Sequence, residues 1–271
     1  MSELTNHDLT VIIPTLNEIE NLGPLINDLQ QQLDDSPQII LADGGSVDGT
    51  VEFAKDNNIP LISSEKGRAK QMNAAFRQVK TELVLFLHGD TRIPAPLTLK
   101  RALLLYTSHK QSQPHKIIAG HFPLKFMGSN KQQHRLFWRY AEEKTASNRP
   151  DTINGDQGLL ISREDFIQLG GYNESLHFLE DQKISDRIFR QGRWIVLPGH
   201  IQTSARRFET EGEHRLYILM SIIMGLFKTG FREFFELAPQ LYRQQSNTSK
   251  LYLTPFFQLI WHIKKNDRYH F

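Results

Sequence analysis

The chain has 271 residues, of which 39% are hydrophobic and 23% charged, values that are ordinary for a soluble globular protein. It contains no cysteine, which excludes disulfides and thiolate chemistry, and its net charge of +2 is too small to indicate a nucleic-acid partner. No apolar stretch reaches the ~18 residues of a membrane-spanning helix, and the polar residues 1–8 do not resemble a signal peptide. We therefore expect a cytoplasmic protein.

The first third of the chain alternates short apolar runs with amphipathic segments. The apolar runs predict strands at residues 9–13, 38–42, 59–62 and 83–87, and the segments between them predict helices, the third at 69–79. Asn17 or Asn21 is expected to cap the first helix and Asp48 the second. Near-continuous apolar strands suit a sheet that is buried on both faces. The alternation therefore predicts an α/β fold of right-handed βαβ units around a mostly parallel sheet.

Beyond residue 90 the expected elements become shorter. The pattern predicts helices near 97–106, 130–145 and 182–190, and a helical tail from about Glu213. Ser129 and Gln132 form a capping box for the helix that begins at Asn130. Strands are expected at 117–126, kinked at its proline, at 159–161 and at 194–197, with a polar connector at 107–116.

Polar loops follow the first two strands. Residues 14–18 and 43–50 contain carboxylates and glycines but no phosphate-binding lysine. Parallel strands bring such loops to one edge of the sheet, where ligands of open α/β sheets bind. This composition suits a nucleotide that is held by its base and ribose. The sequence lacks the glycine-rich motifs of P-loop ATPases and nicotinamide dehydrogenases and the serine elbow of hydrolases, which argues against those classes.

The fourth strand brings His88 and Asp90 to the same edge. Because side chains at i and i+2 of a strand share a face, both are expected to point toward one ligand. An imidazole and a carboxylate there suit a divalent ion that bridges phosphate oxygens. An aspartate at a single strand end is more often a cap or turn residue, but three polar strand ends at one edge favour the ligand interpretation.

Two carboxylates and two arginines complete the set of candidates. Glu180 and Asp181 begin a helix, where capping and the helix dipole explain acidic residues. A carboxylate held near a second acid also suits a general base, and the sequence leaves open which of the two would face a site. Arg68 opens a helix and Arg206 follows a strand, so both suit either phosphate contacts or a solvated surface.

These strings resemble a known family. Residues 12–18, 43–50, 88–90 and 180–181 occur in the order and rough spacing of family 2 glycosyltransferases with the GT-A fold, and the resemblance covers roughly residues 9–207. Within that family the chain resembles the bacterial radical-SAM/selenodomain-associated subgroup, also described as arsenosugar-biosynthesis glycosyltransferases. This narrower match rests on residues 67–69, 88, 155–157 and 203–207.

The resemblance implies an inverting, metal-dependent transfer of sugar from a UDP- or GDP-linked donor to an unidentified hydroxyl acceptor. Asp90 would hold Mg²⁺ or Mn²⁺, and Asp181, with Glu180 beside it, would be the catalytic base. A loop at the acceptor or donor sugar would comprise Gly155, Asp156 and Gln157. The donor would contact Pro14, Thr15, Asn17, Glu18, Asp43, Gly44, Arg68, His88, Asp90 and Arg206.

Two positions depart from the family pattern. His88 stands where the metal motif usually has its first aspartate, and Gly44 replaces the second acid of the usual Asp-Asp-Gly-Ser string. Two alternatives therefore stay open: a nucleotidyltransferase that forms sugar nucleotides, and a nucleotide-binding regulator that has lost catalysis. Residues 14–18 lack the glycine-rich basic loop of the former, and the retained acids at 180–181 argue against the latter.

The expected domains are a catalytic domain at 1–207, with a nucleotide half at about 1–91 and an acceptor half at about 92–207, and a helical extension at 208–271. From residue 206 onward the chain has 10 Lys and Arg against 6 Asp and Glu, together with apolar runs at 216–227 and 251–263. Three interpretations of residues 213–263 stay open: a peripheral helix at the inner face of the membrane, packing on the catalytic domain, or a homodimer interface.

Overall fold

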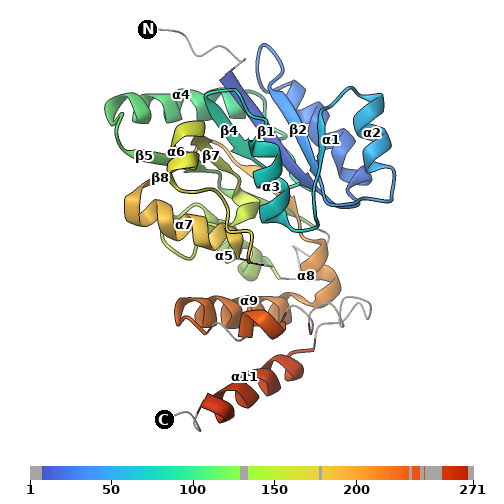
Figure 1. Ribbon diagram of the computed structural model, residues 1–271, viewed down its shortest axis with the longest axis vertical. Coiled ribbons are helices and arrows are strands. Elements are labelled where there is room, and N and C mark those ends of the chain that lie inside the picture. Colours follow the sequence, from blue (N-terminus) through green and yellow to red (C-terminus); the bar gives the residue numbers. More distant parts are fainter. Residues whose placement is uncertain are drawn as a thin grey trace. The chain divides into compact units, whose positions relative to one another are not determined.

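The structure is a computed structural model that describes residues 8–128, 134–176, 179–231, 234–238, 241 and 252–267. Contacts divide the chain into two compact units (Figure 1). The described residues of the first unit fall within 1–127 and 133–203, and those of the second within 128–132 and 204–271. The candidate catalytic residues 180 and 181 belong to the first unit.

Seven described strands of the first unit form a sheet in the order β3–β2–β1–β4–β7–β5–β8. β7 is antiparallel to β4 and β5, and the other neighbours pair in parallel. This confirms the predicted α/β fold with a mostly parallel sheet. The strands are β1 (Leu9–Thr15), β2 (Gln38–Asp43), β3 (Leu61–Ser63), β4 (Leu83–Phe86), β5 (Ile117–His121), β7 (Leu159–Ser162) and β8 (Gly192–Val196).

Helices pack against this sheet. They are α1 (Ile19–Gln30), α2 (Thr50–Asp56), α3 (Arg68–Phe76), α4 (Thr98–Ser112), α5 (Arg135–Thr145), α6 (Arg163–Gln168) and α7 (Glu180–Gln191), with a 3₁₀ turn, η3 (Gly155–Gln157). α3 packs on β1 and β2, and α7 packs on β5 and β8. The core cluster joins these layers through Ile12, Met72 and Ile184. All seven residues of β1 are buried, as its apolar run predicted.

One carboxylate contacts the first residues of two helices. Asp48 Oδ1 accepts a hydrogen bond from the Thr50 backbone N at 3.0 Å, and Oδ2 accepts one from the Ile19 backbone N at 3.1 Å. The N-cap position of α2 is nevertheless Gly49, one residue after the predicted cap. The predicted caps at Asn17 and Asn21 are wrong. The Asn17 side chain instead accepts a hydrogen bond from the Val47 backbone N, and Asn21 lies inside α1.

Several predicted boundaries need correction. The strand expected at 117–126 is two strands, because Pro123 lacks the N–H needed to continue the ladder of β5. Its second part, β6 (Leu124–Met127), pairs with β9 (Ile201–Ser204) in a separate two-stranded sheet. α4 continues through the predicted polar connector, α3 ends at Phe76, and β3 begins at Leu61. The predicted capping box at 129–132 lies outside the described residues.

The described part of the second unit is helical, as predicted for the tail. Its helices include α8 (Arg206–Glu211), α9 (Glu213–Lys228) and α11 (Thr254–Asp267). Among the described residues, no helix is both long enough and apolar enough to cross a membrane. Leu216 and Leu219 of α9 are buried, whereas Ile218 and Met220 are exposed.

Candidate active site

The loops after β1 and β2 interlock through short polar contacts. The buried Asp43 carboxylate accepts hydrogen bonds from the Gly45 backbone N at 2.9 Å and from the Ser46 hydroxyl at 2.5 Å. The same hydroxyl oxygen accepts a hydrogen bond from the Asn17 backbone N at 2.9 Å. The two predicted nucleotide loops therefore form one rigid surface at the carboxyl edge of the sheet, although the Asp43 carboxylate is directed into its own loop.

Gly44 is explained by a neighbouring side chain. The Gln71 amide on α3 donates hydrogen bonds to the carbonyls of Thr15 at 2.8 Å and Ala42 at 2.7 Å, which ties α3 to the ends of β1 and β2. A Cβ at residue 44 would lie 3.0 Å from Gln71 Cδ. Buried Gln71 therefore occupies the space that an acidic side chain at residue 44 would enter.

His88 and Asp90 lie beyond β4, in a turn closed by a hydrogen bond from the Thr91 backbone N to the His88 carbonyl at 3.2 Å. The strand rule used to place them on one face is therefore wrong, because the strand has already ended. The Asp90 carboxylate accepts a hydrogen bond from Thr203 Oγ1 at 3.4 Å. Among the described residues, no three His, Asp or Glu side chains gather closely enough to hold a metal ion.

Both ring nitrogens of His88 face charged groups. Nδ1 lies 3.0 Å from an Asp156 carboxylate oxygen, and Nε2 lies 3.3 Å from the Arg68 guanidinium. Burial is the largest influence and favours the neutral imidazole, but the hydrogen bond with Asp156 and the negative charges of Asp156 and Asp90 together raise the pKa of His88, while Arg68 opposes that rise. A cation beside Nε2 makes this nitrogen a poor metal ligand, which leaves Asp90 as the candidate ligand of the pair.

Glu180 is committed to an ion pair. Its side chain is 3% exposed, and Oε1 lies 2.8 Å from Arg68 Nε. Burial raises the pKa of Glu180; Arg68 partly offsets this effect and Asp181 adds to it. The preceding residue, Leu179, has a left-handed backbone with φ 66°, which is uncommon for a residue other than glycine. It is the N-cap of α7, which begins at Glu180. Arg68 thus contacts Glu180 and His88, two groups far apart in sequence.

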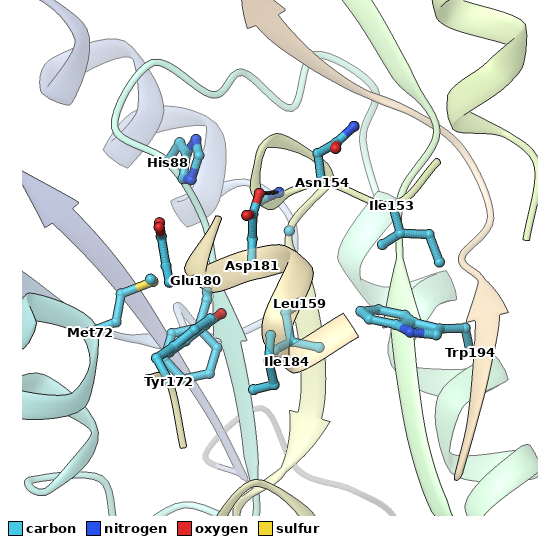
Figure 2. A pocket seen from close by; sticks show the side chains of 13 residues that line it. Met72, His88, Ile153, Asn154, Leu159, Tyr172, Glu180, Asp181, Ile184 and Trp194 are labelled. Carbon is cyan, nitrogen blue, oxygen red and sulfur yellow. Dashed lines mark hydrogen bonds between the residues drawn. The ribbon is translucent and has the colours of Figure 1, made fainter. Parts of the chain in front are cut away.

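Glu180 and Asp181 both line the pocket in Figure 2, and among the described residues only Glu180 forms an ion pair with Arg68. Asp181 Oδ2 accepts a hydrogen bond from the Gly155 backbone N at 2.7 Å, and Oδ1 accepts one from the Gln182 backbone N at 2.8 Å. Residue 155 must be small, because a Cβ there would lie 2.9 Å from His88 Nε2 and 3.3 Å from Asp181 Oδ2. The structure therefore brings Asp181, Gly155 and His88 together.

The pocket also contains residues that the sequence did not indicate. Tyr172, Trp194 and Ile184 line its inner end, and the enclosed space is about 20 Å³, enough for one water molecule. Burial raises the pKa of Tyr172 well above its ordinary value, so its hydroxyl stays protonated. Tyr172 follows a visible Gly-Gly turn, whereas Trp194 lies in a strand without any motif.

The remaining predicted site residues occupy different places. Glu18 lies near the 88–90 turn, because a Cβ at Gly89 would be 3.1 Å from its Cγ. The Gln157 side chain is fully buried and its amide faces His121 and Thr145, so it does not line the pocket, and the role of the 155–157 loop at a sugar stays a prediction. Arg206 begins α8 in the second unit and is exposed, and its phosphate contact stays a prediction.

Comparisons with known proteins agree with this architecture. Glycosyltransferase AglJ of Haloferax volcanii is 32% identical over 83 residues, which are 30% of this chain and 26% of AglJ. S. aureus TarS 1–349, solved in complex with UDP, matches with a TM-score of 0.56 at 20% identity, over 73% of this chain and 60% of that one. The chain therefore spans about a quarter of AglJ and three fifths of that TarS fragment.

A second solved structure is similar. Mannosyltransferase PcManGT from Pyrobaculum calidifontis, in complex with GDP-Man and Mn²⁺, matches with a TM-score of 0.50 at 21% identity, over 73% of this chain and 56% of that one. At these identities the likeness concerns the fold, which is the GT-A fold. The model of Glycosyl transferase family 2 matches residues 10–170, more than half of the sequence. The chain therefore belongs to glycosyl transferase family 2.

Proposed function

We propose that the protein is an inverting glycosyltransferase that moves a sugar from a nucleotide-sugar donor to a hydroxyl acceptor, with Asp181 as the base. The observation that carries this proposal is the contrast between two adjacent carboxylates. Both line the pocket, but Glu180 is paired with Arg68, whereas Asp181 is oriented by two backbone N–H groups. An oriented carboxylate at a pocket suits proton abstraction from a hydroxyl.

The proposed step is a direct displacement at the anomeric carbon. The acceptor oxygen forms a bond to that carbon as the bond to the donor phosphate oxygen breaks, and the configuration inverts. The acceptor proton passes to the Asp181 carboxylate, and the nucleoside diphosphate leaves. Arg68 places positive charge beside the pocket, and it keeps the Glu180 carboxylate from competing for the same proton.

A divalent metal fits this chain at Asp90 only in a limited way. The Asp90 carboxylate is half-buried and accepts a hydrogen bond from Thr203, so it suits one ligand position. Mg²⁺ is often held by one or two carboxylates together with substrate phosphates. A bound Mg²⁺ or Mn²⁺ would neutralise charge that develops on the leaving diphosphate. PcManGT was solved with Mn²⁺, which supports this assignment.

The donor is proposed to be UDP- or GDP-linked, because TarS and PcManGT were solved with UDP and GDP-Man. For the acceptor we propose an arsenosugar. This proposal rests only on the resemblance of residues 67–69, 155–157 and 203–207 to the arsenosugar-biosynthesis subgroup. Family membership and the oriented Asp181 favour transfer over the nucleotidyltransferase and regulator alternatives.

For residues 213–263, peripheral membrane binding and homodimerisation remain two proposals. Ile218, Met220 and Trp261 are exposed, which supports an apolar contact surface. Flotation with anionic vesicles and light scattering of the free protein separate the two proposals.

Asp181→Asn tests the assigned function. We expect donor-dependent release of UDP or GDP to fall about 10³-fold, within the range of general-base catalysis, while calorimetry gives an unchanged donor Kd. Asp186→Asn makes the same change later in α7, outside the pocket, and should keep the wild-type rate. Full activity of Asp181→Asn would refute the assigned base, and failure of the wild type to bind or cleave either donor class would refute the function.

A further inference from the structure

A buried hydrogen-bond network lies behind the pocket. Gln157 is fully buried, and its amide nitrogen donates to the Thr145 carbonyl and to His121 Nδ1, both at 2.9 Å. Its amide oxygen accepts a hydrogen bond from the Asn154 backbone N at 2.9 Å. The side chain therefore joins the ends of β5 and α5 to the loop that precedes β7.

The Gln157 amide has one orientation in this network, because neutral His121 and the Thr145 carbonyl both accept hydrogen bonds from its nitrogen. Burial lowers the pKa of His121 to about 4, so its Nδ1 can accept the Gln157 amide proton at neutral pH. The Thr145 carbonyl can only accept, which fixes the nitrogen and oxygen of the amide. His121 Nε2 is buried without a hydrogen-bond partner, a cost that the other contacts must offset.

The loop of residues 154–157 contacts both Asp181 and His88. Between Asn154 and Gln157, the Gly155 backbone N donates to Asp181, and Asp156 engages His88. Asn154 Oδ1 accepts a hydrogen bond from Gln182, the residue after the proposed base, at 2.9 Å. A displacement of this loop would therefore move the hydrogen-bond donor that orients Asp181.

We propose that Gln157 is a positioning residue for sugar transfer: it anchors the 154–157 loop so that the Gly155 N–H orients the Asp181 carboxylate and Asp156 engages His88. Gln157 touches no substrate, because its side chain is buried on the far side of the loop from the pocket. This inference rests on the proposed role of Asp181.

Gln157→Leu removes three hydrogen bonds and leaves the Asn154 N–H and the Thr145 carbonyl unpaired. A shift of about 1 Å in a catalytic group can cost ~100-fold in rate, so we expect kcat to fall about 10- to 100-fold. The donor Kd should change by less than about threefold, because the loops after β1 and β2 are untouched. The kcat is calculated per binding-competent protein, from the calorimetric stoichiometry, so that an unfolded fraction does not lower it.

Gln32→Leu is the matched control. Gln32 is also a buried glutamine that donates to two carbonyls, those of Ile93 at 3.1 Å and Ala95 at 3.2 Å, and it accepts a hydrogen bond from the Thr98 backbone N at 2.9 Å. Its loss should lower Tm to a comparable extent and leave kcat unchanged.

A second measurement does not depend on turnover. In protein labelled with ¹⁵N-glycine, the Gly155 amide is assigned by its loss in Gly155→Ala and by its shift in Asp181→Asn. We expect Gln157→Leu to shift this amide and accelerate its hydrogen exchange, and Gln32→Leu to leave both unchanged. An inactive wild type would refute the proposed function, and an unshifted, protected Gly155 amide in Gln157→Leu would overturn the positioning role. Equal loss of kcat in the two leucine variants would overturn it too.

Discussion

The predicted nucleotide loops and the two candidate catalytic carboxylates are held in different ways. In the loops, the Ser46 hydroxyl donates a hydrogen bond to Asp43 and accepts one from the Asn17 backbone N. The loops after β1 and β2 therefore hold each other in place. At the start of α7, Asp181 is oriented by Gly155 and Glu180 is paired with Arg68, so the chemistry depends on segments from three parts of the chain. We therefore expect changes in the first region to alter donor affinity, and changes in the second to alter turnover.

Gly155→Ala should have the largest effect in this comparison. The added methyl carbon would lie 2.9 Å from His88 Nε2 and 3.3 Å from Asp181 Oδ2, and one of them must move. We expect kcat to fall about 100-fold, as for a misplacement of ~1 Å, with the donor Kd nearly unchanged. Steady-state release of nucleoside diphosphate and calorimetry measure the two quantities.

Gly23→Ala provides the matched control, since a Cβ there meets nothing closer than 4.0 Å and the residue lies inside α1. It should keep wild-type kcat and raise stability by up to about 1 kcal/mol, because glycine is a poor helix former. Wild-type turnover in Gly155→Ala would show that the close approach at residue 155 does not matter for catalysis.

The network behind the catalytic region should weaken in acid. The folded pKa of His121 is about 4, against 6.5 for the free side chain, so the unfolded chain binds more protons between these values. This contribution to stability is complete above pH 6.5 and is lost as the pH falls toward 4. Lowering the pH from 7.5 to 5 should cost about 2 kcal/mol through this group.

Chemical denaturation across this pH range checks the prediction. His121→Phe removes the titrating group, so its stability should depend less steeply on pH than that of the wild type, whatever its absolute value. Parallel curves for the two proteins would contradict the assignment of a buried, neutral His121.

Asp43→Asn should have the smallest effect on turnover. It weakens the contacts with Gly45 and Ser46 that shape the nucleotide loop, so we expect the donor Kd to rise about tenfold, or ~1.4 kcal/mol, while kcat stays within a factor of about three. Calorimetry and saturation kinetics separate the two. Asp165→Asn changes a buried aspartate paired with Lys110 elsewhere and should leave the donor Kd unchanged. A fall in kcat as large as that of Gly155→Ala would erase the distinction between the two regions.

The sequence by itself determined the βαβ alternation, the polar loops at the carboxyl edge and the acidic pair at 180–181. These features depend on local periodicity and on turn chemistry, and both are properties of residues that lie close together in the sequence. Asp48 illustrates this, because a carboxylate two residues before the start of a helix can be expected to accept a hydrogen bond from one of its first backbone N–H groups. Some boundaries were less accessible: α4 continues into the polar segment as far as Ser112, where Lys110 donates hydrogen bonds to the buried Asp165 carboxylate at 2.8 Å.

Only the tertiary structure decided which carboxylate is free to act and how it is held. Glu180 and Asp181 are adjacent in sequence and equivalent as helix-start residues, yet Arg68 pairs with one and Gly155 orients the other. The partial exposure of Asp156 and the burial of Gln157 were equally hidden, although the two residues are adjacent in the sequence. Their environments are set by partners from distant segments, and burial and pairing with such partners determine what each polar group can do.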